Sequence, residues 1–145
     1  MESRGNVGYP KENGGGPEAF CSTLHWGSDW TTNQFWKTRG EYHHTNGTLA
    51  DDFHVYGLYW DDKVIYTYLD NDTNRILFVN HSSQSYWDRS GLTNRSNPWQ
   101  YSKNKNAPFD TNFYLILNVA VGGTVFFEDG VANKPWKNNS PRASA

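Results

Sequence analysis

The chain has 145 residues, a formal net charge of -2 at pH 7 and a sequence pI of about 6.2. This length fits one domain, and the near-neutral charge provides no basic surface of the kind that binds nucleic acid. No run of about 18 apolar residues is present, so we expect no membrane-spanning helix, and the single cysteine, Cys21, excludes a disulfide framework and a thiolate metal cluster. We therefore expect one domain over residues 1–145, with no nucleic-acid partner and no membrane association.

Aromatic side chains make up 17% of the sequence, although its mean hydropathy of -0.84 is low. This combination is typical of β proteins that bind carbohydrate, because the C–H faces of a sugar stack on rings while its hydroxyl groups need polar partners. The alternative is that the rings fill the core of a β-sandwich.

The first half of the chain predicts short strands separated by polar connections. Val7 to Pro17 is rich in Gly, Pro and Asn and indicates a loop. Phe20 to Trp26 alternates as a strand does, and Phe35 to Arg39 is a further candidate strand. The stretch from Glu41 to Leu49 is a polar connection.

The strongest local signal is a hairpin in the middle of the chain. Asp52 to Trp60 and Val64 to Leu69 are rich in aromatic and β-branched residues, with Asp61-Asp62-Lys63 as the turn between them. Neither face of the first strand is cleanly polar. We therefore expect one face to lie in a core and the other to meet a second layer, a ligand groove, or both.

The second half predicts fewer elements. Ile76 to Asn80 is a candidate strand, and one helical turn is expected near Ser83 to Arg89, within a long polar stretch. Phe113 to Val121 is the most apolar run and ends at Gly122-Gly123, which favours a buried central strand. No long helix is predicted, so the fold class is all-β, most simply a sandwich.

Three stretches of the chain resemble glycoside hydrolase family 16, in particular the animal endo-1,3-β-glucanases (laminarinases) and the related β-1,3-glucan-binding proteins. They are Phe53 to Trp60, Phe113 to Gly123 and Asn133 to Trp136. Met1 to Asn6 resembles the end of that family's catalytic strand, and Leu24 to Gly27 resembles its next groove strand. The resemblance implies a jelly-roll β-sandwich of the concanavalin A type and a β-glucan polysaccharide as the partner.

The signature of that family is Glu-x-Asp-x-x-Glu on one strand, and Glu2 matches its last glutamate, the general acid/base. The nucleophile and the helper aspartate would lie before residue 1, and the family's closing strand would follow the last residue. The resemblance thus implies a partial domain, incomplete at both termini. It also implies retaining hydrolysis, in which the two carboxyl groups lie about 5–5.5 Å apart and a covalent glycosyl intermediate forms.

The resemblance also suggests residues that shape the groove. Adjacent residues on a strand point to opposite faces, so only one of His25 and Trp26 meets a ligand directly. The resemblance places His25 near the acid/base and Trp26 at the groove wall, and a core position is the alternative for Trp26. Asn118 either bonds a ligand hydroxyl or is satisfied by neighbouring backbone. The predicted site comprises Glu2 as the catalytic residue, with Arg4, Asn6, His25, Trp26 and Asn118 as substrate-binding residues.

Other polar groups indicate neither a metal ion nor a cofactor, and we expect none. His43 and His44 are adjacent and diverge on an extended chain. Asp51-Asp52 and Asp70-Asn71-Asp72 lack the periodicity of a calcium loop and are expected to cap turns. Glycosylation sequons begin at Asn46, Asn71, Asn80, Asn94 and Asn138. These sequons fit a secreted protein, and we expect that protein to be a monomer.

Three functions remain open. The first is a glycosidase that cleaves β-1,3-glucan such as laminarin, for which residues 1–145 alone are expected to be inactive. The second is a recognition protein that binds β-1,3-glucan on the same fold without cleaving it. The third is a lectin-like sandwich of another specificity, because one scaffold hosts many glycan-binding chemistries.

Overall fold

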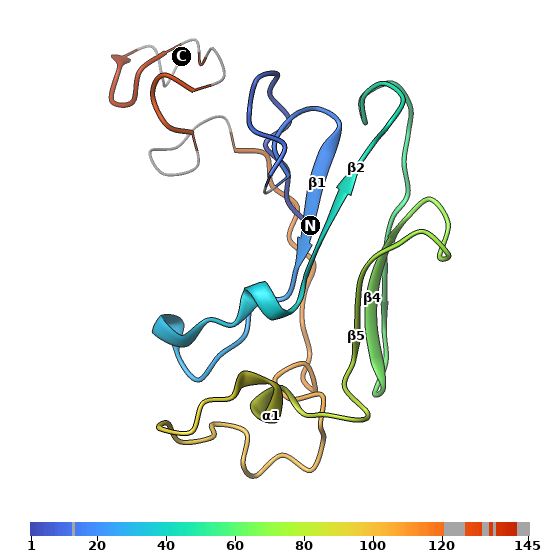
Figure 1. Ribbon diagram of the computed structural model, residues 1–145, viewed down its shortest axis with the longest axis vertical. Helices are drawn as coiled ribbons and strands as arrows, with labels where there is room; N and C mark the ends of the chain where they lie inside the picture. The colour runs from blue at the N-terminus through green and yellow to red at the C-terminus, as the bar shows by residue number, and fades with distance from the viewer. Residues whose placement is uncertain (13, 121–126, 132–133, 135, 142–145) are drawn as a thin grey trace.

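The structure is a computed structural model that describes residues 1–12, 14–120, 127–131, 134 and 136–141. Its strands are β1 (Ala19–Thr23), β2 (Arg39–His43), β3 (Tyr56–Trp60), β4 (Val64–Leu69) and β5 (Arg75–Asn80) (Figure 1). The helical elements are short: the 3-10 turns η1 (Trp30–Thr32) and η2 (Phe35–Lys37), and the α-helix α1 (Tyr86–Ser90).

The strands form two antiparallel sheets, one of β1 and β2 and the other in the order β3-β4-β5. The predicted central hairpin is present as β3 and β4, with Tyr59 opposite Tyr66. Its turn is fixed by Asp61, whose Oδ1 accepts hydrogen bonds from the backbone N–H of Lys63 at 2.8 Å and of Val64 at 2.7 Å. Because these bonds favour the charged carboxylate, they lower the pKa of Asp61.

The two sheets pack against one another through small and polar contacts as well as rings. Thr67 Oγ1 on β4 donates a 2.7 Å hydrogen bond to Ser22 Oγ on β1, and both residues are buried. Gly40 on β2 lies so close to β5 that a Cβ atom there would be 1.9 Å from the Ile76 carbonyl oxygen. The protein is therefore all-β, with sheets arranged as in a jelly-roll sandwich, as the sequence predicts.

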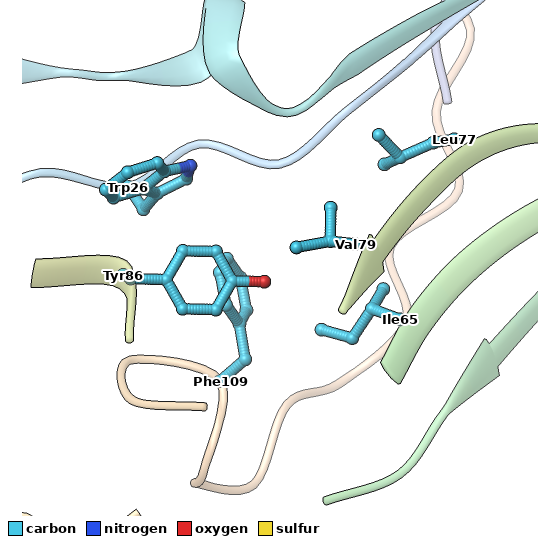
Figure 2. Close-up of a cluster of buried hydrophobic side chains, with 6 residues drawn as sticks. All are labelled: Trp26, Ile65, Leu77, Val79, Tyr86 and Phe109. Carbon is cyan, nitrogen blue, oxygen red and sulfur yellow. The ribbon is translucent and has the colours of Figure 1, made fainter. Parts of the chain in front are cut away.

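The main hydrophobic core lies where the second sheet meets α1. Trp26, Ile65, Leu77, Val79, Tyr86 and Phe109 form one buried cluster (Figure 2). In Figure 2 the rings of Tyr86 and Phe109 lie next to each other, between Trp26 and the aliphatic side chains of the sheet. Ser85 caps α1 by accepting a 3.1 Å hydrogen bond from the Asp88 N–H, which holds the Tyr86 ring in this core.

Two predicted strands are wrong. Phe35 to Lys37 forms η2 because the N–H of Thr38 bonds the Phe35 carbonyl at 3.0 Å, so of the predicted strand only Arg39 enters β2. Residues 113–120 of the predicted central strand are exposed and have no strand assignment; Val121 lies outside the described residues. A strand needs a neighbour to pair its backbone groups, and no described strand pairs with this run.

Candidate functional site

An open cleft of about 870 Å³ lies beside β1, between the N-terminal segment and the run 113–120. It contains five of the six predicted site residues, namely Glu2, Arg4, Asn6, His25 and Asn118. Met1, Ser3, Gly5, Cys21, Thr23, Phe35, Arg39, Val119, Ala120 and Phe127 complete its lining. Residues distant in the sequence thus meet in one concave surface.

Glu2 is held in the cleft by its backbone. Its N–H donates to the Cys21 carbonyl at 2.8 Å, and its carbonyl accepts from the Cys21 N–H at 2.7 Å. Residues that exchange two such bonds in an antiparallel pair present their side chains on the same face. The exposed side chain of Glu2 therefore lies on the cleft face of β1, next to Cys21.

The segment after Glu2 is held by a glycine-rich loop. Arg4 donates its N–H to the Gly14 carbonyl at 2.9 Å and accepts from the Gly16 N–H at 3.0 Å. A Cβ atom on Gly15 would lie 1.8 Å from the Pro10 carbonyl oxygen, so this close backbone approach requires glycine. The Arg4 guanidinium lies 5.4 Å from the centre of the Tyr9 ring, at the edge of the cleft.

Trp26 is the predicted site residue that the structure places elsewhere. Alternation along β1 and its continuation turns Cys21, Thr23 and His25 towards the cleft, so Trp26 faces the opposite way. Its side chain is 4% exposed, and its Nε1 donates a 2.7 Å hydrogen bond to Thr38 Oγ1. The predicted position of Trp26 at the groove wall is therefore wrong, and the alternative position in the core is correct.

His25 is positioned by two neighbours. Its ring stacks on Phe35, with centroids 5.6 Å apart. The amide nitrogen of Asn33 donates to His25 Nδ1 at 2.9 Å, which leaves Nε2 as the donor of the neutral imidazole. Phe35 also lines the cleft, so an aromatic ring and a histidine donor lie together there.

Arg39 is a cleft residue that the sequence reasoning missed. Its Nη2 lies 3.0 Å from Cys21 Sγ and also pairs with Glu41 Oε1. The hydrogen bond to Cys21 and the carboxylate of Glu41 raise the pKa of the Arg39 guanidinium, although its partial burial acts in the opposite direction. Alternate residues of a strand share a face, so the predicted strand that contains His25 also predicts Thr23 and Cys21 on the cleft side. No sequence pattern of this kind identifies Arg39.

The opposite wall of the cleft comes from the run 113–120. Asn118 lies there beside Val119 and Ala120, and its side chain is exposed. Together with Glu2, His25, Arg4 and Arg39, the Asn118 amide provides both donors and acceptors around an aromatic ring. Such a surface suits a polyhydroxylated ligand, whose hydroxyl groups and C–H faces need these two kinds of partner.

The described residues contain no group of three or more His, Cys, Asp or Glu side chains that could hold a metal ion. No helix among them has the length and apolar character needed to cross a membrane.

Comparison with known proteins gives relatives of two kinds. The chain is 47% identical over 145 residues to the "Beta-1,3-glucan-binding protein" of Penaeus monodon, an alignment that covers 99% of this chain and 38% of that protein. It is 34% identical over 124 residues to the "Glucan endo-1,3-beta-glucosidase A1" of Niallia circulans, covering 85% of this chain and 14% of that protein. It is 30% identical over 122 residues to the "Glucan endo-1,3-beta-glucosidase" of Cryptopygus antarcticus, covering 84% of this chain and 39% of that protein.

The chain spans well under half the length of these relatives. No family model matches it, and no solved structure matches it. The relatives support assignment of this chain to a family of β-glucan-binding proteins and glucanases. The resemblance seen in the sequence indicated the same two kinds of protein.

Proposed function

We propose that the protein binds β-1,3-glucan in the cleft and that, within the whole protein, Glu2 is the general acid/base of a retaining endo-hydrolysis. The observation that carries the proposal is the position of Glu2. The Glu2 carboxyl group, which by sequence resemblance corresponds to the acid/base of glycoside hydrolase family 16, lies on the cleft face of β1, among the groups that suit a sugar.

In the proposed reaction, the Glu2 carboxylic acid donates its proton to the oxygen of the scissile glycosidic bond as that bond breaks. A nucleophilic carboxylate forms the glycosyl ester at the same time. The Glu2 carboxylate then removes a proton from water as this water attacks the anomeric carbon. The bond from that carbon to the nucleophilic carboxylate breaks, and the sugar is released with its configuration retained. His25 and Arg39 would donate hydrogen bonds to sugar hydroxyl groups, and Phe35 would stack on a sugar face.

Retention needs a second carboxyl group about 5–5.5 Å from the first. Glu2 is the one carboxylic acid among the described residues of the cleft lining. Glu41 lies on the same sheet, opposite Cys21 on β2, but its carboxylate is paired with Arg39. In this proposal the nucleophile therefore comes from a part of the whole protein outside these 145 residues.

The second candidate function is glucan recognition without cleavage. The relative from Penaeus monodon, at 47% identity, is named as a glucan-binding protein and not as a glucosidase. The cleft would serve either function, because binding needs the donors and the ring but not a pair of carboxyl groups. The two proposals differ in the second carboxyl group.

We also propose that the protein is a secreted monomer. Four of the five sequon asparagines, Asn46, Asn71, Asn80 and Asn94, are exposed, as a glycosylated residue must be. Expression in a secreting eukaryotic host, followed by glycosidase treatment and sizing by light scattering, tests this. An unglycosylated or oligomeric product would contradict it.

The test of function uses the whole protein that carries this sequence, with laminarin as the probe. We expect laminarin binding by calorimetry, release of reducing ends, and a fall in the release rate of about 10²–10⁴ in Glu2→Gln. Glu12→Gln is the matched control, because Glu12 is exposed and does not line the cleft. Binding without any cleavage would favour the recognition protein, and absence of binding would overturn both proposals.

A further inference from the structure

A second pocket, of about 170 Å³, lies between α1 and the loop that follows it. It is lined by Ser85, Trp87, Asn97, Trp99, Gln100, Ser102, Lys103, Asn104, Lys105 and Ala107, and we call it the loop pocket. It shares no residue with the cleft. It comes from the long polar stretch after β5, to which the proposed function gives no role.

Two half-buried tryptophans line the loop pocket. Trp87 belongs to α1, the helix whose Tyr86 is fully buried in the core. Trp99 packs against the same core from the loop, and its backbone N–H donates to Asn97 Oδ1 at 2.9 Å. The Trp99 carbonyl accepts from the Ser102 N–H at 2.9 Å, which closes the turn that begins at Trp99. The fold therefore fixes the backbone that carries both indoles, and the core also contacts the Trp99 ring.

Two amide side chains of the loop pocket, those of Gln100 and Asn104, are free to bind a ligand, whereas Asn97 Oδ1 and the Ser102 hydroxyl are already hydrogen-bonded. In the part of the chain that the structure describes, no group hydrogen-bonds the side-chain amides of Gln100 and Asn104. Lys105 differs, because its Nζ donates to the Ser82 carbonyl at 3.1 Å. A pair of indoles with unpaired amides beside them matches the needs of a neutral sugar, which presents C–H faces and hydroxyl groups that both donate and accept.

The volume limits the size of the ligand. Pockets that enclose a drug-sized molecule measure roughly 300–1,000 Å³. The loop pocket, at about 170 Å³, is smaller and holds a ligand the size of a single sugar ring. We propose that the loop pocket is a second sugar-binding site, which takes a single glucose unit of the same β-glucan that occupies the cleft. This inference rests on the proposed function for the identity of the sugar. Two sites on one polymer would raise the apparent affinity through effective concentration.

The experiment uses the protein labelled with 5-fluorotryptophan and titrated with laminaribiose, observed by fluorine NMR. Each of the seven tryptophans in these 145 residues gives its own signal, and single Trp→Phe variants assign those of Trp87 and Trp99. We expect both signals to shift with saturation, and to shift equally in His25→Ala, which alters the cleft alone. Trp30 is exposed and lines neither pocket, so its signal is the internal control.

The outcomes separate the second site from the proposed function. If calorimetry shows laminaribiose binding that His25→Ala abolishes, while the Trp87 and Trp99 signals stay still, the second site is overturned and the cleft stands. If the Trp30 signal shifts as much as the signals of the loop pocket, contact with the sugar is non-specific and the second site is again overturned. Gln100→Ala, which removes no ring from the core, should weaken the titration of Trp87 at least about fivefold; an unchanged titration also contradicts the proposal. If no signal moves and calorimetry detects no sugar, the second site and the cleft proposal fail together.

Discussion

Glu2 and Cys21 exchange backbone hydrogen bonds in both directions, which makes the N-terminal segment a third strand-like neighbour of the first sheet. This pairing determines where the Glu2 carboxyl lies, because directly opposed residues share a face. On β2, Glu41 is the residue opposite Cys21. A row of side chains from three chain segments therefore crosses the sheet beside the cleft, with Arg39 pairing to two of them.

The first prediction concerns Arg39. Arg39→Gln keeps a polar side chain but removes the charge, so a glucan hydroxyl loses a charge-assisted donor. We expect laminarin binding to weaken by about 1.5–3 kcal/mol, which is tenfold or more in Kd, measured by calorimetry. Arg95→Gln is the matched control, because Arg95 is exposed and does not line the cleft. Equal affinities for the two variants would remove Arg39 from the binding surface.

The second prediction concerns the contact between the sheets at Gly40. Gly40→Ala should lower the free energy of unfolding by about 1–3 kcal/mol, as overpacking does, because the new methyl group would lie 1.9 Å from the Ile76 carbonyl oxygen. Gly5→Ala is the control, since nothing lies within 4 Å of a Cβ atom there. Urea unfolding of both variants measures the difference, and a neutral Gly40→Ala would show that the sheets are further apart.

The third prediction concerns the buried hydrogen bond between the sheets. Thr67→Val should cost about 1–3 kcal/mol, because it leaves the Ser22 hydroxyl buried without its 2.7 Å partner. Adding Ser22→Ala should recover part of this loss, since neither polar group then remains. A double-mutant cycle in urea measures the coupling, and strictly additive effects would mean that the two hydroxyl groups are not paired.

Sequence patterns predicted the elements whose turns or caps come from residues within or next to the element itself. The hairpin of β3 and β4 has its own turn chemistry in Asp61, and α1 has its own cap in Ser85, so both were visible in the sequence. Phe35 to Lys37 has the composition of a strand but folds as η2. Residues 113–120 have the apolar character of a central strand, but a strand is a relation between two segments, and composition does not reveal a partner.

The candidate site was predictable where the resemblance and the strand alternation acted together. Glu2 and His25 were found in this way, and alternation alone explains why Trp26 belongs to the core once His25 faces the cleft. Arg39 could not be found, because it lies on a different strand from Cys21 and their proximity depends on the pairing register of β1 and β2. The loop pocket depends in the same way on the packing of Trp99 against the core.

The last prediction concerns His81 and pH. His81 is fully buried, its Nε2 donates to the Asp61 carbonyl at 3.2 Å, and within the described residues its Nδ1 has no partner. Burial lowers the pKa of His81, although the bond to Asp61 and the charges of Asp61 and Asp62 act in the opposite direction. The native protein therefore resists protonation of a side chain that the unfolded chain protonates below a pH of about 6.5.

Because the unfolded state binds more protons in this range, stability falls as the pH decreases below about 6.5, and it stops falling when the pH reaches the lowered native pKa. The contribution has a slope of up to about 1.4 kcal/mol per pH unit for one proton. Urea unfolding between about pH 7.5 and about pH 5 should show a shallower dependence of stability on pH in His81→Gln than in the parent protein. His25→Gln, which alters an exposed histidine, should keep the steeper dependence. If His81→Gln and the parent protein lose stability in parallel, His81 is not the group that titrates.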